Sequence, residues 1–268
     1  MDSSYYRQVS RYYDQDAGDF DLRYWSNSVL QRTRQSFREI VKSHSFDNML
    51  EIGCGTGIDI CHFARIYPGK KIYGIDISPE MCRIAENKVS ALKLKNAVVK
   101  TGSPEDLNAL FPGIKFDMIY VFFGALNTTE NLRSISVHLH NKLNEDGKMI
   151  LTFVNKWYLV EILINLFKLR FSKALRRNKS IWGGYSPKKF LPSRCLSPAD
   201  IRKAFTGQFR ITKQRGYSIL FPAWYRNHWI KRFGRRISHG MWELDKMLNK
   251  TFLRGFGEYA LYEFTRRV

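Results

Sequence analysis

The chain has 268 residues, of which 44% are hydrophobic, and this is enough to bury the core of one large domain with appended elements. Its formal net charge of +20 favours an anionic partner such as nucleic acid, an anionic membrane surface or an acidic small molecule, although a basic solvated surface carries the same charge. The four cysteines form neither a CxxC pair nor a zinc-type spacing with histidine, so we expect no metal site and no disulfide framework.

The N-terminal segment, residues 1–45, is predicted to be helical. Its first residues are polar and acidic, which is not the pattern of a signal peptide, and we expect a cytoplasmic protein. Val29, Leu30 and Phe37 recur at helical spacing and predict a helix over residues 28–41. No uninterrupted apolar run in the chain reaches about 18 residues, so a membrane-spanning helix is not expected.

Residues 46–155 alternate between short apolar strands and helices. Strands are predicted at 48–53, 70–78, 97–103, 116–126 and 147–155, and helices at 57–67, 78–92 and 131–143. Ser78 is the expected N-cap of the second helix, and Asp146-Gly147 is the expected turn before the last strand. This alternation predicts an α/β fold with a doubly wound, mostly parallel sheet covered on both faces.

The pattern changes beyond residue 155. An apolar helix is predicted over 157–171, followed by six basic residues and no acids from Lys168 to Lys179, and a further helix begins after Ser197. Two strands at 209–220 and 257–268 are expected to pair antiparallel, which brings the sheet to seven strands. We therefore expect two helical cap insertions, at 156–196 and at 221–255, the second lying within a C-terminal part of the core over 197–268.

A glycine-rich turn follows the strand at 48–53. Gly53, Gly55 and Gly57 precede a helix N-terminus, where free backbone N–H groups and the positive end of the helix dipole can face a ligand. Asp76 ends the second strand, nineteen residues past Gly57, and an acid at this distance reaches ribose hydroxyls in doubly wound sheets. The two features together predict a nucleotide-type site.

Five motifs in order resemble those of the class I S-adenosylmethionine-dependent methyltransferases, which have a Rossmann-like fold. They are LEIGCGTG, GIDISPEMCRIA, GSPEDL, FDMIYVFFGALN and LNEDGKMILTF, within residues 47–155, and the resemblance resumes at 197–220 and 257–266. It implies an enzyme that binds S-adenosylmethionine in the core over 46–155. The cofactor-binding residues that it implies are Glu51, Gly53, Cys54, Gly55, Asp76, Ile77, Met81, Gly102, Ser103, Pro104, Glu105, Phe122 and Phe123.

The third of these motifs departs from the family. Family members usually have Gly-Asp-Ala, with the acid on the adenine amino group, whereas this chain has Gly102-Ser103-Pro104-Glu105. Ser103 can accept a hydrogen bond from the amino group, but Pro104 has no N–H to donate to the ring. Either Glu105 takes part or packing holds the adenine.

The residues beside the methyl group are implied by the same resemblance. Asn127 follows the fourth strand and is a candidate to orient an acceptor, although an N-cap role for the next helix is equally consistent with its position. Tyr13 and Tyr24 lie in a lead-in similar to that of methyltransferases acting on quinone precursors and lipids, and are candidates to close the site; surface aromatic anchors are the alternative.

The predicted function is methyl transfer to a small, lipophilic or anionic acceptor by in-line displacement. The basic, aromatic segments 157–179 and 224–236 also suit peripheral contact with an anionic membrane, or they simply cap the core. A nucleic-acid methyltransferase is a less favoured alternative, and a non-catalytic binder with the same fold is another. The sequence sets neither the acceptor atom nor the oligomeric state.

Overall fold

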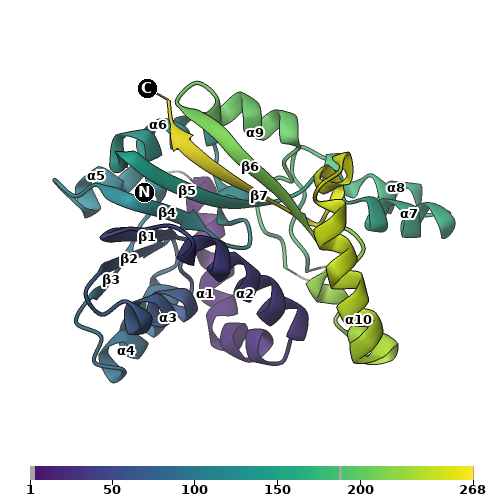
Figure 1. The fold of residues 1–268 in the computed structure, drawn as a ribbon, viewed down its shortest axis with the longest axis horizontal. Helices are drawn as coiled ribbons and strands as arrows, with labels where there is room; N and C mark the ends of the chain where they lie inside the picture. Colours follow the sequence, from purple (N-terminus) through teal and green to yellow (C-terminus); the bar gives the residue numbers. More distant parts are fainter. Residues whose placement is uncertain (1–3, 187–188, 268) are drawn as a thin grey trace.

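The computed structural model describes residues 4–186 and 189–267, and its centre is a seven-stranded sheet in the order β3-β2-β1-β4-β5-β7-β6 (Figure 1). Strands β1 to β5 are parallel, and β7 pairs antiparallel with both β5 and β6. The bounds of the strands are β1 Asn48–Ile52, β2 Lys71–Asp76, β3 Ala97–Thr101, β4 Phe116–Val121, β5 Leu143–Val154, β6 Phe209–Tyr217 and β7 Tyr259–Arg266. The predicted doubly wound, mostly parallel sheet of seven strands is confirmed.

Helices cover both faces of the sheet (Figure 1). One face packs on α2 (Ser28–Lys42), α3 (Ile58–Ile66) and α4 (Pro79–Ala91), and the other on α5 (Leu107–Leu110), α6 (Leu132–Lys142) and α9 (Pro198–Phe205). Adjacent residues of a strand divide between the two cores: Met49 lies in the first and Leu50 in the second. Burial on both faces is why these strands are apolar without alternation.

Two helix starts follow the local sequence. The hydroxyl of Ser78 accepts a hydrogen bond from Met81 N at 3.1 Å, with Pro79 in the first turn of α4. Ser197 and Asp200 form a capping box at α9. Such caps satisfy backbone N–H groups that the first helical turn leaves unpaired, and both start where the sequence predicts.

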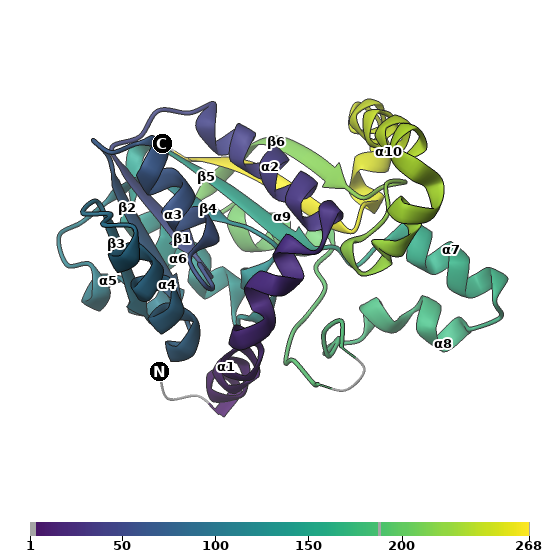
Figure 2. The same ribbon diagram turned by 90° about the horizontal axis from the view of Figure 1, so that it is seen from below.

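Helix α1 (Ser4–Trp25) crosses the carboxyl ends of the parallel strands and leads into α2 (Figure 2). Hydrogen bonds fasten it to the core at several points: among them, Ser78 Oγ donates to Asp14 at 2.6 Å, Thr56 Oγ1 donates to Asp21 at 2.5 Å, and Tyr6 Oη donates to Glu105 at 2.5 Å. These contacts place α1 over the glycine-rich turn and over the end of β3.

The first insertion differs from the expectation. The single helix predicted over 157–171 is wrong: α7 (Leu159–Phe167) ends at Phe167 and a short helix, α8 (Phe171–Ala174), follows. Leu169 has a φ of 54°, outside the right-handed helical region, and Arg170 N bonds back to Asn165 O at 2.8 Å. An apolar composition alone did not reveal this break. Helices α7 and α8 project from the body of the molecule (Figure 2).

The turn expected at Asp146-Gly147 is also wrong as an element boundary. Both residues lie within β5, whose pairing with β4 changes register between Phe116 and Met118. Gly147 fits here because a Cβ would come 2.6 Å from Leu143 Cγ. A bulged strand therefore replaces the expected turn and strand.

The second insertion holds α10 (His228–Leu248), which changes direction at Gly234, where φ is 75° and ψ is 172°. Asp245 of this helix accepts hydrogen bonds from the backbone N–H groups of Ile219, Leu220 and Phe221. The remaining short helices are η1 Pro104–Asp106, η2 Ala125–Thr128, η3 Arg176–Asn178, η4 Trp224–Arg226 and η5 Phe252–Phe256. Within the described residues, none of the helices combines the length and the apolar character that crossing a bilayer requires.

Both insertions meet at Asn155, directly after β5. Its amide nitrogen donates to Gly255 O at 2.7 Å and to Gly257 O at 2.9 Å, and its carbonyl side-chain oxygen accepts from Trp157 N at 3.1 Å. Asn155 is fully buried. One side chain thus joins the beginning of the first insertion to the end of the second.

Candidate active site

A cavity of about 440 Å³ lies at the carboxyl ends of β1, β2, β4 and β5, beneath α1. Ligands of doubly wound sheets bind at this edge, and the volume is in the range of small-molecule sites. One half of the cavity is formed by the glycine-rich turn and the ends of β2 and β3. The other half is formed by residues after β4 together with both insertions.

The glycine-rich turn has a left-handed backbone at all three glycines, with φ of 73° at Gly53, 53° at Gly55 and 76° at Gly57. Gly53 N donates to Ile75 O at 2.8 Å, which fixes the turn against β2. A Cβ at Gly53 would come 2.3 Å from the Cβ of Ala125. Glycine is required here both by the backbone conformation and by the close approach of the turn after β4.

Asp76, at the end of β2, bonds to the backbone of the glycine-rich turn. Its carboxylate accepts hydrogen bonds from Gly55 N at 2.8 Å and from Ser78 N at 3.0 Å, and its side chain lines the cavity. Burial raises the pKa of Asp76 to about 6, although these backbone hydrogen bonds favour the ionised form. The carboxylate keeps further acceptor capacity for hydroxyl donors in the cavity.

Residues of the third motif line the same half of the cavity. Gly102, Ser103 and Pro104 contact it, together with Ile77 and Met81. Ser103 Oγ donates to Asp106 at 2.9 Å, so its oxygen keeps the capacity to accept a hydrogen bond. Glu105 points instead to α1, where it accepts a hydrogen bond from Tyr6 Oη.

Three implied cofactor residues stay outside the cavity lining. Glu51 is buried beneath the turn, where it accepts a hydrogen bond from Tyr120 Oη at 2.9 Å, and burial raises its pKa well above the usual range. Cys54 packs behind the turn, with its Sγ 3.1 Å from where a Cβ on Gly74 would lie. Glu105 is the third. The structure brings the other ten of the thirteen into the cavity wall: Gly53, Gly55, Asp76, Ile77, Met81, Gly102, Ser103, Pro104, Phe122 and Phe123.

The three candidate acceptor-side residues all line the cavity. Tyr13 is close enough to Asp76 and Tyr259 for both to raise its pKa, after the larger effect of burial. The ring of Tyr24 lies 4.6 Å from the guanidinium carbon of Arg34. The amide of Asn127 is already engaged, because its oxygen accepts from Val154 N and its nitrogen donates to Val154 O and Arg194 O. It ties the turn after β4 to β5.

An aromatic wall from the two insertions faces this half of the cavity. The sequence placed Trp224 and Tyr225 within the basic, aromatic segment 224–236 of the second cap insertion, and it named Trp182 and Tyr185 in no candidate site. Tyr185 is at the centre of this wall, with ring centroids 4.5 Å from Trp182, 5.0 Å from Trp224 and 5.5 Å from Tyr225. The signal was present in the sequence as tryptophan and tyrosine near residues 182–185 and 224–225. Nothing in the sequence shows that two segments about 40 residues apart meet.

A buried ion cluster supports this wall. The guanidinium of Arg177 lies 2.8 Å from Glu161 of α7 and 3.3 Å from Glu258, which immediately precedes β7. Both carboxylates and Arg177 are almost completely buried. A paired charge of this kind holds the first insertion against the end of the sheet, because separating it would leave unpaired charges inside.

The comparisons with known proteins agree with this geometry. Residues 50–149 match the model of a family described as a methyltransferase domain. An uncharacterized protein of Methanocaldococcus jannaschii is 28% identical over 94% of this chain and 88% of its own length. A malonyl-[acyl-carrier protein] O-methyltransferase of Ilyobacter polytropus is 34% identical over 41% of this chain, and a demethylmenaquinone methyltransferase of Porphyromonas gingivalis is 29% identical over 54%. The chain spans 40% and 59% of the lengths of these two named enzymes.

Solved structures share the fold. An S-adenosylmethionine-dependent methyltransferase from Clostridium acetobutylicum superposes with a TM-score of 0.55 at 17% identity, covering 84% of this chain and 86% of that one. An O-methyltransferase from a polyketide synthase multienzyme of Brevibacillus brevis, in complex with S-adenosyl-L-homocysteine, gives 0.53 at 16% identity, covering 82% and 67%. At this identity the solved structures show the shared fold alone. The match of residues 50–149 to the methyltransferase-domain model, together with the five ordered motifs and the cavity at the carboxyl ends of the strands, identifies the chain as a class I S-adenosylmethionine-dependent methyltransferase with S-adenosylmethionine as its cofactor.

Proposed function

We propose that the protein transfers the methyl group of S-adenosylmethionine to a small, lipophilic or anionic acceptor. The observation that carries the proposal is the two-part cavity: a polar half around Asp76 is continuous with an aromatic half formed by the insertions. The bound cofactor supplies an electrophilic methyl group on a sulfonium. The protein then has to align the acceptor with that methyl group and exclude water.

Asp76 is the proposed ligand of the ribose hydroxyls, because it is a carboxylate at the end of β2 that already anchors the glycine-rich turn. Gly53 and Gly55 present backbone without side chains beside it. Ile77, Met81 and Pro104 supply apolar surface for the adenine. Glu51 and Cys54 lie behind the turn, so their proposed role is to support its shape.

The aromatic half favours a planar or lipophilic acceptor. The rings of Phe123, Tyr185 and Trp224 line it, and aromatic walls of this kind bind apolar bodies while placing polar groups at chosen points. Three cationic side chains also reach the cavity, namely Arg23, Arg34 and Lys189. Arg23 pairs with Asp16, and Arg34 pairs with Asp59. The charge of Lys189 favours an acceptor with an anionic substituent.

We propose that the segments 1–45, 156–196 and 221–255 together form the cover of this site. Tyr13 and Tyr24 of α1 contribute from one side, and Trp182 and Tyr225 contribute from the other. Two similar proteins are methyltransferases of an acyl-carrier-protein conjugate and of a quinone precursor, and neither of them is named for a nucleic-acid acceptor. Their names therefore favour the small-molecule acceptor over the nucleic-acid alternative.

Calorimetric titration with S-adenosylmethionine tests the cofactor half. Asp76→Ala is expected to abolish measurable binding, whereas Asp146→Ala, which removes an exposed carboxylate in β5, is expected to leave the affinity unchanged. The acceptor half is tested by incubating the protein and methyl-labelled cofactor with a small-molecule extract to which RNA has been added. Mass spectrometry then identifies the labelled products. Equal affinities for the two variants, or label confined to added RNA, would contradict the proposal.

We further propose that the tip of the first insertion contacts an anionic membrane surface. Its apolar residues are exposed, namely Leu163, Leu166, Phe167, Leu169, Phe171 and Leu175. Lys168, Arg170 and Lys173 alternate with them and are exposed as well. Apolar side chains flanked by cations match an interface of acyl chains below anionic headgroups. In the segment 224–236, Trp224 and Tyr225 line the cavity and are not available to lipid. The cations left to contact lipid headgroups there are the exposed Lys231, Arg232, Arg235 and Arg236.

Cosedimentation with vesicles tests this contact. The protein is expected to bind phosphatidylcholine vesicles that contain phosphatidylserine and not those of phosphatidylcholine alone. The double variant Phe167→Ser, Leu169→Ser is expected to lose this binding, because burial of a phenylalanine contributes about 2 kcal/mol. Phe252→Ser serves as the matched control, since this phenylalanine is similarly exposed and lies in η5, outside the two proposed contact segments. Binding that survives the double variant would refute the contact.

A further inference from the structure

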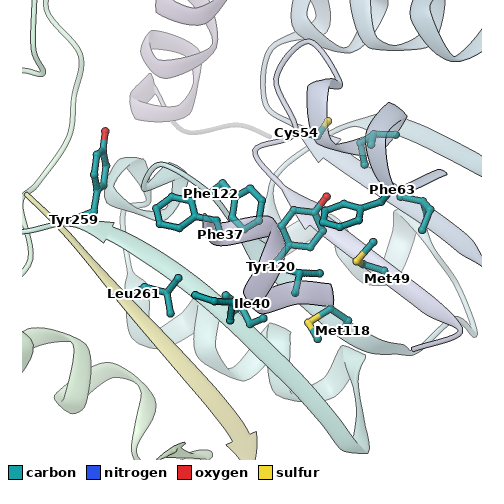
Figure 3. Packing of buried hydrophobic residues seen from close by; sticks show 14 of the residues in the cluster. Phe37, Ile40, Met49, Cys54, Phe63, Met118, Tyr120, Phe122, Tyr259 and Leu261 are labelled. Atoms are coloured by element: carbon teal, nitrogen blue, oxygen red, sulfur yellow. The ribbon is translucent and has the colours of Figure 1, made fainter. Parts of the chain in front are cut away.

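Tyr259 opens β7 at the edge of the sheet where the cavity lies. Because β7 runs antiparallel to β5, its first residue pairs with Val154, the last residue of β5. The ring of Tyr259 packs on Phe123, which follows β4, with centroids 5.6 Å apart. Its hydroxyl points away from the row of core side chains below it (Figure 3). Tyr259 therefore lies against the part of the cavity that holds the acceptor in the proposed function.

A chain of two oxygen atoms, Tyr185 Oη and Glu258 Oε1, leads from the hydroxyl of Tyr259 into the protein interior. Tyr185 Oη lies 3.4 Å from Tyr259 Oη and donates its proton to Glu258 Oε1 at 2.5 Å. The geometry makes Tyr185 the donor toward Tyr259 as well, and Trp224 also bonds the hydroxyl of Tyr259. A phenol has one proton, so once the proton of Tyr185 has moved onto Glu258, the oxygen of Tyr185 is free to accept the proton of Tyr259. Tyr185 and Tyr259 line the cavity and Glu258 does not.

Glu258 is suited to receive a proton. Its side chain is completely buried, and burial raises its pKa above the usual range, although Arg177 and the hydroxyl of Tyr185 oppose this shift. The negative charge of Glu161, on the other side of Arg177, adds to the rise. The second oxygen, Oε2, is buried and has no hydrogen-bond partner among the described residues. Protonation of this carboxylate would leave Arg177 paired with Glu161.

Three other polar groups in the cavity wall already have partners within the protein. Asp16 is held by Arg23 in two hydrogen bonds, Asp76 anchors the glycine-rich turn, and the amide of Asn127 is used by backbone groups. Among the described residues that line the cavity there is no histidine.

Tyr225 also lines the cavity and donates to Glu161 at 3.0 Å. However, Arg177 and Arg176 hold the pKa of Glu161 below its usual value despite burial. Tyr259 and Tyr185 lead instead to Glu258, whose pKa is raised, so a proton released in the aromatic half has a direct route to a carboxylate that can take it.

We propose that Tyr259, Tyr185 and Glu258 form a proton relay that deprotonates the acceptor, which is therefore a hydroxyl compound of the phenol or enol type. The inference rests on the proposed function and names the acceptor group for that same site. Tyr259 is the catalytic residue of the relay, because its oxygen faces the acceptor. Tyr185 and Glu258 act through it as positioning residues and as the route of the proton.

The step balances without a further reactant. The acceptor oxygen forms a bond to the methyl carbon as the bond from that carbon to sulfur breaks, and the bonding pair returns to sulfur to give S-adenosylhomocysteine. The acceptor proton passes to Tyr259 Oη, the proton of Tyr259 to Tyr185 Oη, and the proton of Tyr185 to Glu258 Oε1. The products are a methyl ether and a neutral carboxylic acid, and the reverse transfer to water resets the relay when the product leaves.

A series of substituted phenols of graded acidity tests the relay. Wild-type protein is expected to methylate them at rates that depend weakly on phenol acidity. Tyr259→Phe and Glu258→Gln are expected to methylate acidic nitrophenols at nearly the wild-type rate, and weakly acidic phenols about 10²-fold to 10³-fold more slowly, as expected for loss of a general base. In the wild type, kcat/KM is expected to rise with pH through one ionisation that Glu258→Gln removes.

Tyr262→Phe is the matched control. Tyr262 lies on the same strand and is equally buried, but its hydroxyl has no hydrogen-bond partner among the described residues and does not line the cavity. Its variant is expected to follow the wild type across the series. Calorimetry with S-adenosylmethionine should give one affinity for all four proteins, which separates the relay from cofactor binding.

Two results would overturn the relay, and a third would overturn the proposed function as well. If Tyr259→Phe slows every phenol by the same factor, the tyrosine has a structural role and the relay fails, while methyl transfer to small acceptors stands. If the wild type binds the cofactor but methylates no phenol, the hydroxyl acceptor fails together with the relay. If Asp76→Ala also retains cofactor affinity, the proposed function itself fails.

Discussion

The two halves of the cavity are built in different ways. The cofactor half consists of short turns that follow β1, β2 and β3, and its key groups are glycine backbone and one carboxylate. The acceptor half consists of large side chains from two insertions that are far apart in the sequence, supported by ions buried between them. The first is made by local backbone conformation and the second by long-range packing. Mutations should therefore act on binding in one half and on folding in the other.

Arg177→Met gives the largest expected effect and tests the acceptor half. The variant leaves the buried carboxylates of Glu161 and Glu258 without their shared cation, so we expect a loss of about 3–5 kcal/mol in the free energy of unfolding. Urea denaturation followed by tryptophan fluorescence measures it. Arg83→Met removes an exposed ion pair on α4, outside the cavity, and is expected to change nothing measurable. Equal losses in the free energy of unfolding for the two variants would contradict the structural role assigned to the buried ion cluster.

Two alanine substitutions in the glycine-rich turn test the cofactor half. Gly53→Ala combines a φ of 73° with a Cβ 2.3 Å from Ala125, so we expect it to weaken S-adenosylmethionine binding by about 2–3 kcal/mol. Gly55→Ala meets only the ring of Phe20 at 3.5 Å, and its expected cost is about 1 kcal/mol. Calorimetry gives both affinities. An order of effects opposite to this one would mean that the turn rearranges on binding.

The pH dependence of cofactor affinity gives the smallest expected effect. Burial raises the pKa of Asp76 to about 6, and only the ionised carboxylate can accept both ribose hydroxyls. Below pH 6 the protein must release a proton before it binds, so the affinity should fall about tenfold per pH unit, or about 1.4 kcal/mol. It should be constant above pH 7. Asp76→Asn binds weakly and without this dependence, and a wild-type affinity constant from pH 7 to 5 would contradict the assignment.

The sequence was sufficient to predict the fold and to choose residues of which most line the cavity, because those features are local. Ser78 and Pro79 start a helix through their own side chains, and Gly53 to Asp76 is a motif of fixed spacing. The burial of strands on both faces likewise shows in their unbroken apolar composition.

The acceptor half could not be predicted from the sequence, because its geometry depends on contacts between segments that are far apart in the chain. Tyr185 and Tyr259 are 74 residues apart, and only the folded chain brings their hydroxyls to 3.4 Å. Asn127 was chosen for its position after β4, and the structure shows its amide bonded to the backbone of Val154 and Arg194. The break in the helix after Phe167 is a backbone event that composition does not record.

The junction at Asn155 has a consequence for how such enzymes diversify. The side-chain amide of Asn155 bonds the end of the second insertion, and Asn155 itself immediately precedes the first. The two insertions therefore share one attachment point at the edge of the sheet. A chimera that exchanges only one of them with a relative would leave the other without its boundary contacts. If the two insertions set acceptor preference, as proposed, they therefore have to be exchanged as a matched pair of segments while the core is left unchanged.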